Sequence, residues 1–132
     1  MGTGSGYQAA VLAETTDTVF TIELIPELAK EAGALLKKLD YNNVIVRAGD
    51  GYNGWPEHAP FDIIIVTAAA EKIPGPLIEQ LAEGGRLVIP VGQQGATQEL
   101  KLVTKKRGKV EVSRLMYVLF VPFKRGSTLD EK

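Results

Sequence analysis

Residues 61–67 constrain the fold more strongly than any other stretch of the sequence. They read Phe-Asp-Ile-Ile-Ile-Val-Thr and are almost continuously apolar. Such a run is typical of a strand that is buried on both faces, as in a parallel sheet covered by helices. We therefore expect residues 61–67 to be an inner strand of an α/β fold.

Strand and helix patterns alternate along the rest of the chain. Strand patterns occupy 19–24, 44–46 and 86–91, and helical patterns occupy 8–13, 27–39 and 74–81, with Gly84 and Gly85 after the last helix. This order predicts a mostly parallel, doubly wound sheet with helices on both faces. Helix 27–39 is expected from an apolar stripe at helical spacing, which consists of Leu28, Ala32, Leu35, Leu36 and Leu39.

The carboxyl-terminal third has a different pattern. Residues 99–104 and 110–121 flank a basic run at 105–109, which predicts an antiparallel strand pair at the edge of the sheet. The basic run is then a solvated hairpin turn. An RNA-binding patch is the alternative, which the lack of interleaved aromatic residues disfavours. We expect residues 1–125 to form one domain and 126–132 to be a disordered tail.

A glycine-rich loop opens the chain and predicts a ligand site. Gly2, Gly4 and Gly6 alternate with small polar residues ahead of helix 8–13. Glycines let the backbone approach a ligand closely, and the first N–H groups of a helix face that ligand. The third glycine comes one residue too early for the dinucleotide pattern G-x-G-x-x-G, whereas G-x-G-x-G suits S-adenosylmethionine-dependent methyltransferases. A flexible glycine-serine leader is the alternative.

Two more segments fall at the ends of predicted strands. Glu23 follows the glycine loop by about 20 residues, where an acid commonly binds ribose hydroxyls. Asp50 could accept a hydrogen bond from an adenine amino group while Gly51 admits the ring. Each segment has an alternative interpretation. Glu23 could place a negative charge at the amino terminus of a helix, and Asp50-Gly51 could be a simple turn. Together with the glycine loop, they predict one cofactor site at the carboxyl edge of the sheet.

Small residues follow strand 61–67 and suggest the acceptor. Thr67, Ala68 and Ala69 replace the Asn/Asp-Pro-Pro-aromatic motif of many amino-group methyltransferases, and they leave room for a polypeptide. They supply no general base, but a carboxylate acceptor is already anionic near neutral pH and needs only positioning. His58 is expected to be structural or at the surface.

Composition limits the remaining classes of function. The 132 residues carry a net charge of −1, which implies no general attraction to nucleic acid or anionic membranes. Cysteine is absent, which excludes disulfides, thiolate metal ligands and a cysteine nucleophile. No metal site is predicted. With no signal peptide and no apolar run of spanning length, we expect a cytoplasmic protein.

The chain resembles the protein-L-isoaspartate (D-aspartate) O-methyltransferase family. The matching segments read GTGSGYQAA at 2–10, GDGYNGWP at 49–56, FD with VTAAA within 61–70, GGRLVIPVG at 84–92 and FVP at 120–122. The resemblance implies a Rossmann-like methyltransferase fold that uses S-adenosylmethionine to methylate the α-carboxylate of L-isoaspartyl residues in damaged proteins and peptides. Gly2, Thr3, Gly4 and Gly6 would then hold the methionine side of the cofactor, Glu23 the ribose, and Asp50 with Gly51 the adenine. Thr67, Ala68 and Ala69 would face the substrate.

The resemblance also implies differences from the family. Family members have a longer amino-terminal part with the first sheet strand and a serine-containing segment over the substrate, and neither has a counterpart here. We therefore expect a sheet that lacks its first strand, and the resemblance assigns no catalytic residue. The full-length form would be a monomer that binds neither nucleic acid nor membranes. Alternatives are another small-molecule or RNA methyltransferase on this fold and a non-catalytic cofactor-binding remnant.

Overall fold

The computed structural model describes residues 10, 12–14, 16–93 and 97–118, with the side chains of 117 and 118 left out. The described residues up to Gly51 belong to one compact unit, and those from Tyr52 onward belong to a second. The glycine loop, the tail 126–132 and most of the predicted helix 8–13 lie outside the described residues, although Ala10, Leu12 and Ala13 are helical as predicted.

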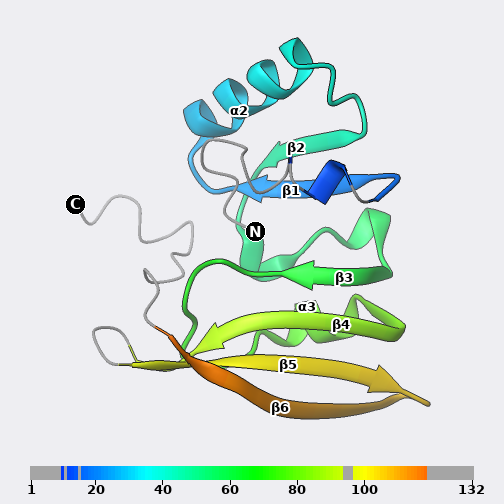
Figure 1. The fold of residues 1–132 in the computed structure, drawn as a ribbon, viewed down its shortest axis with the longest axis vertical. Helices are drawn as coiled ribbons and strands as arrows, with labels where there is room; N and C mark the ends of the chain where they lie inside the picture. The colour runs from blue at the N-terminus through cyan, green and yellow to red at the C-terminus, as the bar shows by residue number, and fades with distance from the viewer. Residues whose placement is uncertain (1–9, 11, 15, 94–96, 119–132) are drawn as a thin grey trace. The chain divides into compact units, whose positions relative to one another are not determined.

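The first unit is a parallel strand pair covered by a helix. Strand β1 (Val19–Glu23) leads through helix α2 (Pro26–Lys38) to strand β2 (Val44–Ala48). The two strands pair in parallel from Val19 opposite Val44 to Glu23 opposite Ala48. Pro26 starts α2, where its missing N–H costs nothing. Figure 1 shows α2 lying along the strand pair, and all three elements fall close to the predicted ranges.

The buried face of α2 differs from the predicted stripe. Ala29, Ala32 and Leu36 are buried, and Leu36 forms a small core with Ala13 and Val19. Three leucines of the stripe are exposed instead. The pair of strands beneath α2 is narrow, so it covers only one row of side chains on the helix. The exposed leucines are Leu28 at 37%, Leu35 at 46% and Leu39 at 57%.

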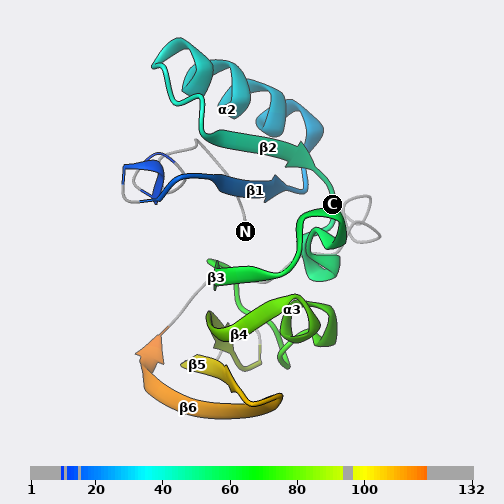
Figure 2. The same cartoon turned by 90° about the vertical axis from the view of Figure 1, so that its right-hand side faces the viewer.

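The second unit is a four-stranded sheet with the order β3-β4-β5-β6. Two short 3₁₀ helices, η1 (Gly51–Asn53) and η2 (Pro56–His58), lead into strand β3 (Phe61–Ile65), helix α3 (Gly75–Glu79) and strand β4 (Leu81–Val91). Strands β5 (Gln98–Lys106) and β6 (Lys109–Val118) complete the sheet. The β3–β4 pair is parallel and the other two pairs are antiparallel. This confirms the predicted mixed sheet with an antiparallel edge, and Figure 2 shows α3 against one face.

The described strands therefore form two sheets, and β1 and β3 are each an end strand.

The prediction that β3 is buried on both faces was wrong for this chain. Ile64 is buried at 6% exposure, but Ile63 is 58% exposed. The ladder aligns Ile64 with Leu87, and Leu87 with Val103, so these side chains share one face. That face also carries Lys105, which contacts α3, whereas Ile63 points to the opposite face. Among the described residues of the second unit, helix α3 lies on the face of the sheet that carries Lys105.

The start of β4 also differs from the prediction. Helix α3 ends at Glu79 rather than at Leu81, and Gly84 and Gly85 lie inside β4 rather than after a helix. The ladder pairs Phe61 with Leu81 but Ile63 with Arg86, so β4 carries extra residues as a bulge. Gly84 has φ of 80°, a left-handed conformation that glycine adopts without strain and that permits this bulge.

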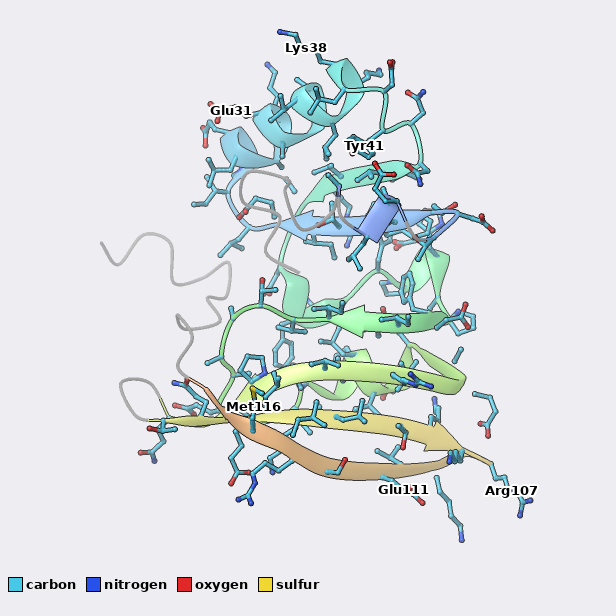
Figure 3. The ribbon with its side chains drawn as sticks, in the orientation of Figure 1. Glu31, Lys38, Tyr41, Arg107, Glu111 and Met116 are labelled. Carbon is cyan, nitrogen blue, oxygen red and sulfur yellow. The ribbon has the colours of Figure 1, made fainter. Side chains whose placement is uncertain are left out.

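The basic run at 105–109 forms the hairpin turn between β5 and β6, as predicted. Arg107 and Gly108 have φ of 54° and 74°, the left-handed pair expected of a tight two-residue turn. Figure 3 shows Arg107 at the hairpin tip. Lys105 corrects the idea that the whole run is solvated. Its Nζ donates to the carbonyl oxygens of Ile78 in α3 at 3.3 Å and of Leu81, the first residue of β4, at 3.0 Å. The last turn of a helix leaves carbonyl groups such as that of Ile78 without helical partners.

Candidate functional site

Glu23 is the last residue of β1 and is buried, with 7% of its surface exposed. Its Oε2 accepts a hydrogen bond from the backbone N–H of Ile25 at 3.2 Å, and its carbonyl oxygen accepts from Gly49 N at 2.9 Å. The carboxylate therefore sits in the turn that leads into α2, where a negative charge is favourable. The hydrogen bond from Ile25 N–H supports the alternative interpretation, in which Glu23 stabilises the amino terminus of the helix. Ribose binding by Glu23 stays a prediction.

Asp50 and Gly51 follow β2 at the same edge of the parallel pair as Glu23. Strand β2 ends at Ala48, and the N–H of Gly49 bonds to Glu23, so the two strand ends lie side by side. Asp50 is half-buried, and Gly51 is buried where it begins η1. The carboxyl ends of parallel strands are where α/β sheets bind ligands. The first unit therefore brings two of the three predicted cofactor segments to one edge.

Thr67, Ala68 and Ala69 form a short segment at the carboxyl end of β3 in the second unit. Val66 N donates to Val88 O at 2.9 Å, and Ala70 N donates to Pro90 O at 3.0 Å. These backbone bonds hold both ends of the segment against β4. Ala69 is buried, while Thr67 and Ala68 are half-buried. Within this segment, no carboxylate or imidazole is present to act as a base.

The segment after η1 holds a contact that the sequence analysis did not identify. The buried side chain of Gln80 accepts from Trp55 N at 2.8 Å and donates to Asn53 O at 2.9 Å. Trp55 is also buried, and its ring meets the exposed His58 ring edge-on, with centroids 5.2 Å apart. The exposed position of His58 agrees with the prediction that it is structural or at the surface. The sequence feature that could have pointed to Gln80 is its position as a polar residue at the end of a short apolar helix.

One tyrosine in the first unit has a shifted pKa. The Tyr41 hydroxyl donates to Glu14 Oε1 at 2.7 Å. This hydrogen bond, then desolvation and then the negative charge of Glu14, raise the pKa of Tyr41 above its usual value. Figure 3 labels Tyr41. Within the described ranges, no three histidine, cysteine, aspartate or glutamate side chains gather into a group that could hold a metal.

Gly2, Thr3, Gly4 and Gly6 lie outside the described residues, so their place in the site stays a prediction. What the structure does show is parallel strand pairs with acidic, glycine and small residues at the carboxyl ends. A Rossmann-like methyltransferase has this architecture, and solved structures of that class match the chain.

Comparison with known proteins identifies the family. The family model "Protein-L-isoaspartate(D-aspartate) O-methyltransferase (PCMT)" matches residues 1–128, and the chain belongs to this family. It is 62% identical over 125 residues to the protein-L-isoaspartate O-methyltransferase of Opitutus terrae. The aligned region covers 95% of this chain and 54% of that protein.

Two solved structures show the same relationship. A protein-L-isoaspartate O-methyltransferase superimposes with a TM-score of 0.87 at 30% identity, covering 95% of this chain and 41% of the other. A Plasmodium falciparum protein described as PCMT, in complex with S-adenosyl-L-homocysteine, superimposes with a TM-score of 0.74 at 31% identity. That match covers 94% of this chain and 63% of the other. The chain thus spans about half the length of the curated relatives it matches.

None of the helices in the described part of the chain is long and apolar enough to cross a membrane.

Proposed function

We propose that this protein transfers a methyl group from S-adenosylmethionine to the α-carboxylate of L-isoaspartyl residues in damaged proteins and peptides. The observation that carries the proposal is the family match along nearly the whole chain, at 62% identity to one named enzyme. The strand ends support it, because Glu23 and Asp50 share one edge of a parallel pair. The backbone nitrogen of the next residue would then displace methanol from the ester to form a succinimide, which water reopens partly to normal aspartate.

The residues at the strand ends fit the cofactor. The carboxylate of Glu23 would accept hydrogen bonds from the ribose hydroxyls, and Asp50 would accept one from the adenine amino group beside Gly51. Gly2, Thr3, Gly4 and Gly6 would hold the methionine side. The cofactor supplies an activated methyl group on a positively charged sulfur. The burial of Glu23 strengthens such bonds, because a charged acceptor in a low-dielectric site binds hydroxyl groups more tightly than it does in water.

The protein's own part in the chemistry is positioning. An isoaspartyl carboxylate is anionic near neutral pH, so no general base has to remove a proton from it. Thr67, Ala68 and Ala69 would line the acceptor side, where their small side chains leave room for a polypeptide. Backbone bonds from Val66 and Ala70 fix both ends of this segment. Holding the acceptor in line with the methyl group can supply most of the rate enhancement.

A methyl-transfer assay tests the proposal. The 132-residue protein is given an isoaspartyl peptide and, separately, the aspartyl peptide of the same sequence. Methylation of the isoaspartyl peptide alone is the expected result. Cofactor binding without methylation of either peptide would instead favour the non-catalytic alternative. Methylation of RNA or of a small amine would favour another methyltransferase activity.

Calorimetry on Glu23 variants tests the cofactor site. Charge-assisted hydrogen bonds contribute about 1.5–3 kcal/mol each, so Glu23→Ala should weaken S-adenosylhomocysteine binding by at least about tenfold. Glu23→Gln keeps an oxygen for Ile25 N–H and should weaken binding less. Glu31→Ala is the matched control, because Glu31 is an exposed acid on α2 (Figure 3). Equal affinities for Glu23→Ala and Glu31→Ala would remove Glu23 from the site.

The proposal also covers the bounds of the domain, the compartment of the protein and its oligomeric state. Residues 1–125 would form the methyltransferase domain, and 126–132 would lie outside it. A net charge of −1 and the lack of cysteine support a cytoplasmic protein that binds neither nucleic acid nor membranes. The full-length form would be a monomer, which sedimentation at several concentrations checks.

A further inference from the structure

The Gln80 amide holds the segment that follows the predicted adenine site. Its oxygen accepts from Trp55 N at 2.8 Å, and its nitrogen donates to Asn53 O at 2.9 Å. Gln80 itself is buried at 8% exposure, between the end of α3 and the start of β4. A buried amide that satisfies two backbone groups at once fixes that backbone strongly, because losing either bond would leave a buried polar group unpaired.

Gly54 shows how closely the segment and this amide fit. Gly54 lies between the two bonded residues and has φ of 65°. A Cβ atom placed on Gly54 would lie 2.2 Å from Gln80 Oε1 and 2.7 Å from its Cδ. The backbone thus lies directly against the amide, at a distance only glycine permits. The left-handed conformation at this position also favours glycine.

We propose that Gln80 is a positioning residue for cofactor recognition: by fixing residues 53–55, it sets the backbone of the loop that carries Asp50 and Gly51. Asn53, whose carbonyl Gln80 binds, ends the 3₁₀ helix η1 that begins at Gly51. The inference rests on the function proposed above, because it assigns Asp50 to the adenine amino group. Gln80 itself would not touch the cofactor.

The inference predicts a loss of base selectivity, which a purely structural role would not produce. The measurement compares the affinities of S-adenosylhomocysteine and S-inosylhomocysteine, which carries a carbonyl oxygen in place of the adenine amino group. The native protein should prefer the adenosyl compound, since Asp50 can accept from its amino group. In Gln80→Leu this preference should fall by about tenfold, the factor that corresponds to about 1.4 kcal/mol.

Gln98 provides the matched control. Gln98 is also a buried glutamine of the second unit, at 1% exposure, and its Nε2 donates to Gln93 O at 3.2 Å. Gln98→Leu removes a comparable buried amide, so it should lower the melting temperature while leaving the base preference unchanged. Gln80→Glu keeps an acceptor for Trp55 N–H and loses the donor to Asn53. It should show an intermediate preference, and it serves as the second variant if Gln80→Leu does not fold.

The outcomes separate this inference from the function on which it rests. If the native protein prefers the adenosyl compound, and both Gln80 variants keep that preference at full strength, Gln80 has no positioning role. Equal losses of preference in Gln80→Leu and Gln98→Leu would assign the effect to stability and overturn the inference as well. If the native protein binds neither compound, the cofactor proposal fails, and the Gln80 inference fails with it.

Discussion

Replacing Ile63 by alanine should destabilise the protein far less than the same change at Ile64. The two residues are neighbours in β3, but Ile63 is 58% exposed and Ile64 only 6%. Each substitution removes three carbon atoms, and a fully buried carbon contributes about 0.8 kcal/mol. Less than half of the Ile63 side chain is buried, so Ile63→Ala should cost about 1 kcal/mol. Ile64→Ala also leaves a cavity and should cost about 2–5 kcal/mol.

Urea denaturation of the native protein and both variants measures these costs. The loss of a β-branched residue from a strand is common to both variants, so the difference between them reports burial. The slope of each transition should stay the same, which shows that the change lies in stability rather than in compactness. Equal costs for the two variants would refute the reasoning, because they would mean that the Ile63 face is covered in solution.

Three further predictions concern contacts that lie away from β3. Lys105→Met should lower the free energy of unfolding by about 1–2 kcal/mol, because it removes two hydrogen bonds from a half-buried charged group. Tyr41→Phe should destabilise the protein below a pH of about 10, where the hydroxyl still donates to Glu14. That difference should vanish as the pH rises through the raised pKa of Tyr41 in the folded protein. Gly54→Ala should cost more stability in the native protein than in a Gln80→Ala background, with a coupling energy of about 0.5–3 kcal/mol.

Each of these has its own control and contrary result. Lys106→Met is matched to Lys105→Met, because Lys106 is an exposed neighbour, and equal effects would deny the role of the Ile78 and Leu81 carbonyl groups. A pH-independent difference between the native protein and Tyr41→Phe would show that the hydroxyl bond is absent in solution. Strict additivity of Gly54→Ala and Gln80→Ala would show that the amide moves aside easily.

The strand and helix order was predictable because it depends on local patterns. The β-branched runs that became β1 and β2, Pro26 at the start of α2 and the turn at Arg107-Gly108 all act within a few residues. The positions of Glu23 and Asp50 followed from the same patterns, since parallel strands share a carboxyl edge.

Features that depend on tertiary neighbours were not predictable. The exposure of Ile63 and Leu39 depends on which other elements pack against the sheet face or the helix face that carries them. An apolar sequence pattern does not show whether such elements are present. The side chain of Lys105 reaches Ile78 in α3 across 27 residues of sequence, and Gln80 reaches Trp55 across 25. The bulge at Gly84 and Gly85 needed the register of β3 and β4, so the glycines were assigned to a helix end instead.

The β5–β6 turn also allows proteolysis to measure how often this hairpin opens. Lys105, Lys106, Arg107 and Lys109 place four trypsin recognition sites within five residues. A protease needs an extended backbone, but the carboxylate of Glu83 accepts hydrogen bonds from the N–H groups of Arg107 and Gly108 and holds the turn closed. Cleavage at these sites should therefore wait for the hairpin to open. Where opening and closing are fast relative to cutting, the cleavage rate then measures the small population of molecules in which this edge of the sheet has come apart.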